Sequence, residues 1–80
     1  MLVLMSLLEK KNDKVIYNFG SKQNVLDGVI HIDLKDIEQS RVEKMPSDNS
    51  VYPGYANKAM GKLARLILKG EIPEKAEYCS

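Results

Sequence analysis

The sequence contains little of the chemistry on which many functional classes depend. Its 80 residues include one cysteine, one histidine and no tryptophan. A lone cysteine (Cys79) cannot form a disulfide within the chain, and small secreted domains usually need several, so we expect a cytoplasmic protein. One cysteine and one histidine cannot assemble a Cys/His metal cluster either. We therefore expect neither a metal nor another cofactor.

Neither sign of charge dominates, and no apolar stretch is long. Twelve Lys and Arg residues against eleven Asp and Glu residues give a net charge of +1, without the large basic excess of a dedicated nucleic-acid-binding protein. Residues 1–8 are nearly all apolar, but a membrane span needs about 20 such residues. The run also lacks the basic start and the small-residue cleavage site of a secretory signal. We interpret it as core and expect no membrane association.

The length allows one small domain, which here comprises residues 1–80. A folded chain of this size buries only about 60% of the surface that its unfolded form exposes. The free energy gained by burial and the entropy lost on ordering the chain are then about equal. We expect the monomer to be marginally stable and to benefit from a partner.

The first two strands are predicted as a hairpin at the N-terminus. Residues 2–8 are ambiguous by themselves, because Leu and Met favour a helix. The segment 14–19 that follows is β-branched and aromatic, which favours a strand. Asn12 and Asp13 between the two segments are typical hairpin turn residues. The pair is therefore interpreted as two antiparallel strands.

Two further strands are predicted before the middle of the chain. Residues 29–34 alternate, so that Ile30, Ile32 and Leu34 share one face of a strand and the residues between them share the other. Residues 41–45 are weakly apolar, carry charges and end before a proline, which is typical of an edge strand. Short connections make the four strands an antiparallel meander.

The clearest element is an amphipathic helix over residues 53–69. Ser50 is a plausible N-cap and Gly70 a plausible C-terminal cap. The apolar residues of the segment fall within an arc of about 100°: Ala56, Ala59, Met60, Leu63 and Ile67. Residues 71–80 are predicted to be a short polar tail. The sequence thus predicts an α+β fold, a four-stranded antiparallel meander with one C-terminal helix on one face (β-β-β-β-α).

One helix can cover only one face of such a sheet, while the first strand is apolar on both faces. A half-buried strand normally shows polar residues on its open side. We therefore expect self-association, as a dimer, through the sheet face or the N-terminal strand. The candidate interface residues include two tyrosines, a residue type favoured at interfaces, and are Val3, Met5, Leu7, Val29, Tyr52 and Tyr55. The alternative is that the first strand is central and the tail folds back over the exposed side.

Four basic residues cluster on the side of the helix away from its apolar arc: Lys58, Lys62, Arg65 and Lys69. Such a stripe could contact an acidic protein partner or the phosphates of a nucleic acid. It could equally be a solvated face, since basic residues near a helix C-terminus complement the helix dipole.

His31 and Asp33 are the only pair that suggests chemistry. Two residues apart on a strand, they share one face, and a carboxylate can orient an imidazole or join it as a metal ligand. No nucleophile is tied to them by a motif, and the glycines match no phosphate-binding loop. We expect a non-enzymatic protein–protein interaction module. The alternative is a nucleic-acid-associated regulator, and hydrolytic or metal chemistry at His31 and Asp33 is a third possibility.

Overall fold

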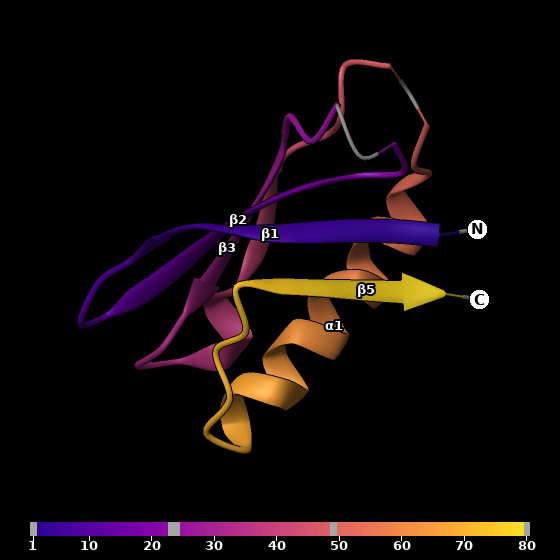
Figure 1. Cartoon of the computed structure of the whole chain (residues 1–80). Helices are drawn as coiled ribbons and strands as arrows, with labels where there is room; N and C mark the ends of the chain where they lie inside the picture. Colours follow the sequence, from indigo (N-terminus) through magenta and orange to yellow (C-terminus); the bar gives the residue numbers. More distant parts are fainter. Residues whose placement is uncertain (1, 23–24, 49, 80) are drawn as a thin grey trace.

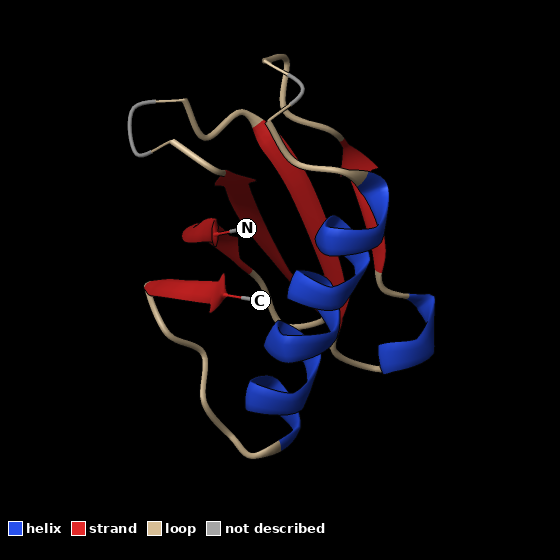
Figure 2. Cartoon of the chain, turned by 90° about the vertical axis from the view of Figure 1, so that its right-hand side faces the viewer, coloured by secondary structure: helices blue, strands red, loops and turns tan. Residues whose placement is uncertain are grey.

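The computed structural model describes residues 2–22, 25–48 and 50–79. The ends of the predicted 1–8 segment and of the predicted 71–80 tail, Met1 and Ser80, lie outside these residues. The chain forms an antiparallel sheet with one helix across one of its faces (Figures 1 and 2). The strands are β1 (Leu2–Lys10), β2 (Lys14–Gly20), β3 (Gly28–Asp33), β4 (Arg41–Lys44) and β5 (Lys75–Cys79), the helix is α1 (Pro53–Leu68), and a short 3₁₀ turn, η1 (Ile37–Gln39), precedes β4.

The strand order across the sheet is β4-β3-β2-β1-β5, with every neighbouring pair antiparallel. β1 to β4 form the predicted meander, and β4 lies at one edge as expected. The chain then runs through α1 to the opposite edge, where β5 pairs with β1 (Figure 1). The α+β class, the antiparallel sheet and the single helix are thus confirmed for the described residues.

The predicted number of strands and the predicted C-terminal position of the helix are wrong. The sheet has five strands, and α1 lies between β4 and β5. Part of the segment that was expected to be a polar tail forms β5, with Ala76 and Tyr78 half-buried and alternating with exposed Lys75, Glu77 and Cys79. Its sequence signal is weak, because only two of its residues are turned towards the core. What makes it a strand is the pairing with β1, a contact between distant parts of the chain.

The core lies between α1 and one face of the sheet. Val15, Tyr17 and Phe19 of β2 and Ile30 and Ile32 of β3 are fully buried there. The predicted face of the third strand is therefore the covered one, with Leu34 partly buried at its end. The apolar arc of the helix faces the same core, where Ala56, Ala59 and Leu63 are buried and Met60 and Ile67 are partly buried.

Two contacts join the core to the chain segments around it. The Tyr17 hydroxyl donates a hydrogen bond to the carbonyl of Pro73, 2.5 Å away, in the connection between α1 and β5. Gly28 leaves room for the Phe19 ring, because a Cβ atom at position 28 would lie 2.6 Å from it. Without that space the aromatic ring could not lie against β3.

The two ends of α1 differ from each other in how they are capped. Gly70 follows the helix with a φ of 89°, the left-handed conformation that glycine adopts without strain, as the sequence predicted. The N-cap residue is Tyr52 rather than Ser50, and no side chain caps this end. The Ser50 hydroxyl donates to Asp48 instead, 2.6 Å away, in the loop before the helix.

Candidate functional site

The face of the sheet opposite α1 is the largest surface that the fold leaves without a second layer. Figure 2 shows the helix on one side of the strands only. We call the other side the open face. The strand register places these residues on it: Leu2, Leu4, Ser6 and Glu9 of β1; Lys14, Ile16 and Asn18 of β2; Val29, His31 and Asp33 of β3; Arg41, Glu43 and Lys44 of β4; Lys75, Glu77 and Cys79 of β5.

Apolar side chains lie among polar ones on the open face, although no helix covers it. Asn18, the neighbour of Ile16 on that face, pairs with Ser6 and with Val29. Ile16 and Val29 lie on the central strands β2 and β3 and are half-buried among neighbouring side chains. Leu4 is half-buried on β1, and Leu2 at the end of the same strand is 40% exposed. Apolar side chains in the middle of an uncovered sheet face are unusual, since such a face commonly carries polar residues.

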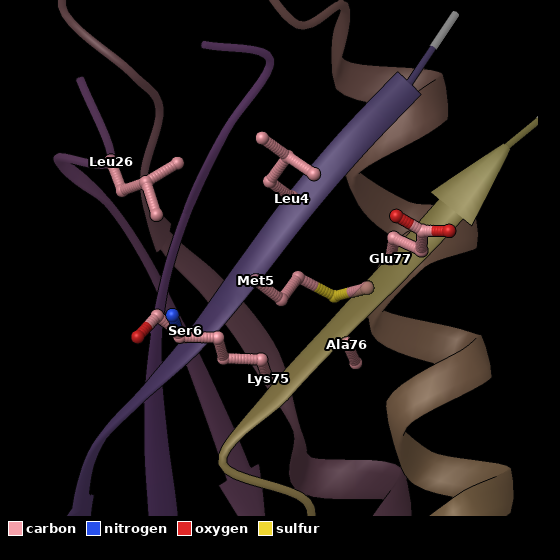
Figure 3. A pocket seen from close by; sticks show the side chains of 7 residues that line it. All are labelled: Leu4, Met5, Ser6, Leu26, Lys75, Ala76 and Glu77. Carbon is pink, nitrogen blue, oxygen red and sulfur yellow. The ribbon is translucent and has the colours of Figure 1, made fainter. Parts of the chain in front are cut away.

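One end of the open face is hollowed by the loop that follows β2. A Cβ atom at Gly20 would lie 2.3 Å from the Val25 carbonyl oxygen and 3.2 Å from a methyl group of Leu26. The loop therefore folds closely onto Gly20, which is the cross-strand partner of Leu4. Figure 3 shows the resulting groove, whose lining residues come from this loop, β1 and β5: Leu4, Met5, Ser6, Leu26, Lys75, Ala76 and Glu77.

Charged side chains also lie on the open face, around the apolar ones. On β4, Arg41 is 2.7 Å from a Glu43 carboxylate oxygen, and His31 Nδ1 of β3 is 3.1 Å from the same oxygen. The hydrogen bond from His31, together with the positive charge of Arg41, lowers the pKa of the Glu43 carboxyl. These contacts order the β3–β4 side of the open face.

His31 and Asp33, the third possibility considered from the sequence, have different hydrogen-bond partners. The Asp33 carboxylate accepts hydrogen bonds from the backbone N–H groups of Lys35 and Asp36, at 2.9 and 3.0 Å. These bonds, that from Asp36 first, lower the pKa of Asp33. His31 bonds across to Glu43 instead. In the part of the chain that the structure describes, no group of three or more His, Cys, Asp or Glu side chains could hold a metal ion.

Two of the predicted interface residues belong to the core. Val3 is fully buried and Met5 is 2% exposed, both beneath α1, and Leu7 is partly buried against the same cluster. The expectation that Val3 and Met5 form a surface is therefore wrong in this fold. The physical reason is that the helix covers the odd-numbered side of β1, so the even-numbered residues Leu2 and Leu4 are the ones left open.

The remaining interface candidates lie on different sides of the sheet. Val29 is on the open face, whereas Tyr52 and Tyr55 lie at the start of α1. Tyr52 is 65% exposed, Tyr55 packs partly against the core, and their ring centroids are 6.2 Å apart. The two tyrosines therefore do not extend the surface around Val29.

The basic stripe of α1 is divided by its own contacts. The Lys62 ammonium donates a hydrogen bond to the backbone carbonyl of Glu77 in β5, 2.5 Å away. Lys58 lies over the Tyr55 ring, 5.6 Å from its centroid. Arg65 and Lys69 are exposed further along the helix. Lys62 thus has a structural partner that the sequence pattern did not indicate, because β5 itself was not predicted.

Among the residues that the structure describes, no helix is long and apolar enough to cross a membrane. Comparison of the chain with known proteins gave no match to any family model, curated protein or solved structure.

Proposed function

We propose that this protein is a non-enzymatic interaction module that forms a dimer through the open face. The observation that carries the proposal is the presence of apolar side chains on that uncovered face, Leu4, Ile16 and Val29 on three adjacent strands. Covering these side chains with a second sheet would remove apolar surface from water. This stabilises the dimer by about 25 cal/mol for each Å² of apolar surface buried. A chain of this size buries little surface by itself, so this gain would be a substantial part of its stability.

The charged side chains of the open face favour a second copy of the chain, rather than a strongly charged protein, as its partner. Four basic and four acidic side chains lie on the open face: Lys14, Arg41, Lys44 and Lys75, and Glu9, Asp33, Glu43 and Glu77. A two-fold interface brings the same surface patch onto itself, so a balanced patch can pair its positive groups with its own negative groups. A patch of one sign would be repelled by its own copy.

The dimensions of the sheet suit such a contact. Sheets packed face to face lie about 10 Å apart, with the side chains of the two inner faces interdigitating. A standard interface buries about 800 Å² on each partner. That is about one sixth of the 4931 Å² accessible surface of this chain.

Sedimentation equilibrium at micromolar concentration tests the proposal with two matched variants. Ile16→Lys places a charge in the middle of the open face and is expected to give a monomer, because an unpaired charge would be buried in the dimer. Leu68→Lys makes the same type of change at a leucine that is 70% exposed at the end of α1, and it is expected to leave the dimer intact. Circular dichroism checks that both variants fold. A wild-type protein that sediments only as the 9.0 kDa species would contradict the proposal.

A further inference from the structure

β5 is the edge strand on one side of the sheet. Along it, the backbone N–H and C=O groups of successive residues point alternately towards β1 and towards the free side. Leu7 N–H donates to the Glu74 carbonyl at 2.7 Å, which fixes which residues of β5 turn their backbone groups towards β1. In an antiparallel ladder the hydrogen-bonded positions alternate along the strand. Ala76 and Tyr78 therefore face β1, and Lys75, Glu77 and Cys79 direct their N–H and C=O groups to the free side.

The bond from Lys62 agrees with this assignment and occupies the middle of the free edge. Its ammonium donates to the outward carbonyl of Glu77 at 2.5 Å. Beside this bond, between α1 and β5, lies an open hollow of about 530 Å³ whose apolar lining includes Leu66, Ile72 and Ala76. Free edges of sheets are templates for another strand, and a lysine at the edge is one of the devices that oppose such pairing.

The sequence of β5 is self-complementary in one antiparallel register. When two copies of β5 are centred on Ala76, Lys75 of one copy lies opposite Glu77 of the partner subunit, and the reverse pair forms on the other side of the axis. Both positions have outward backbone groups, so both pairs can exchange hydrogen bonds, and opposite charges face each other across the strands. The register centred on Glu77 would instead place two carboxylates opposite each other.

We propose that the free edge of β5 is a second self-association surface, which pairs antiparallel with β5 of another copy in the register centred on Ala76, and which Lys62 keeps closed. Pairing requires Lys62 to release the Glu77 carbonyl, so the edge contact is weak while the lysine is in place. The proposal does not rest on contact through the open face, because the edge is formed by backbone groups of β5 that lie beside the sheet.

The test uses the full chain carrying Ile16→Lys, which removes contact through the open face. In this background we compare Lys62 with Lys62→Met, a side chain of similar length without the charge or the donor. The Met variant is expected to associate about tenfold more tightly in sedimentation velocity, since a charge-assisted hydrogen bond no longer competes with the partner strand. Backbone amide exchange of Lys75 and Glu77 should become slower as protein concentration rises, while that of Ala76 stays constant.

Charge changes within β5 check the register. Added to Lys62→Met, Lys75→Glu should abolish the concentration-dependent protection, and the double change Lys75→Glu with Glu77→Lys should restore it. Lys62→Arg, which keeps a donor, should behave as the Lys62 parent does, and Lys62→Leu, which has neither charge nor donor, provides a second open variant if the Met variant folds poorly. Exchange at Lys75 and Glu77 that does not depend on concentration in the open variants, or a double change that restores nothing, would overturn the proposal. Failure of the open-face dimer would leave these measurements unaffected, since every variant here lacks that contact.

Discussion

The two faces of the sheet differ in their apolar content and in their surroundings. On the covered face, Ile30 of β3 is fully buried beneath α1, while on the open face Ile16 of β2 is only half-buried. β1 contributes to both faces, with Val3 and Met5 in the core and Leu4 on the other side. In β2 the helix covers the side with Val15, Tyr17 and Phe19, and the open side carries polar residues beside Ile16. The helix therefore lies on the more apolar face, over which the chain crosses from β4 at one edge to β5 at the other.

The largest expected difference between the faces comes from truncating one isoleucine on each. Ile30→Ala removes a fully buried side chain and leaves a cavity, so we expect it to lower the free energy of unfolding by about 2–5 kcal/mol. Ile16→Ala, measured at a concentration that keeps the chain monomeric, should cost below about 1 kcal/mol, since its side chain already contacts water. Urea unfolding followed by circular dichroism measures both changes. Equal losses would mean that the two faces are equally covered in the monomer.

A smaller loss of stability is expected from removing the Tyr17 hydroxyl, a polar group on the covered face. Tyr17→Phe removes the hydrogen bond to the Pro73 carbonyl and should cost about 0.5–1.5 kcal/mol at neutral pH, measured by thermal unfolding. Burial raises the pKa of the Tyr17 hydroxyl, so the unfolded chain loses this proton at a lower pH than the native one. The contribution of the Tyr17 hydroxyl to stability is therefore complete below about pH 10, and it is lost as the pH rises through the native pKa.

The pH dependence provides the control for that variant. Tyr17→Phe should make the decline in stability above about pH 10 shallower than in the wild type, because the proton released on unfolding is no longer there. A decline of unchanged steepness would show that Tyr17 is not the group responsible. On the open face the sign is opposite: the lowered pKa values of Asp33 and Glu43 stabilise the folded chain at neutral pH, and this contribution is lost as the pH falls through the native pKa values.

Local sequence signals predicted most of the sheet and the helix. The β-branched alternation of β2 and β3, the turn at Asn12 and Asp13 and the glycine after α1 each depend on a few neighbouring residues, and these elements were correct. β5 was missed because its strand character comes from pairing with β1, more than 60 residues earlier in the chain. No local pattern indicates such a contact in a segment where only Ala76 and Tyr78 are half-buried and alternate with exposed residues.

The sequence predicted that one face of the sheet would lack a cover, but it did not predict correctly which residues of β1 lie on that face. The single helix indicated that one side of the sheet would lack a cover, yet Val3 and Met5 were assigned to the surface and belong to the core. Deciding between odd and even positions needed the register between β1 and β2, where Met5 lies beside buried Phe19. The alternation of Ile16 with buried neighbours in β2 was the signal that could have marked the open face.

Contact between two open faces is tested most directly by isotope-filtered nuclear Overhauser measurements on a mixture of labelled and unlabelled protein. The dimer predicts intermolecular signals from the methyl groups of Leu4, Ile16 and Val29. It predicts none from Ile30 or Leu63, which are buried between the sheet and α1. A sample that is dimeric by sedimentation but shows its intermolecular contacts only at α1 would contradict the assignment of the open face as the interface.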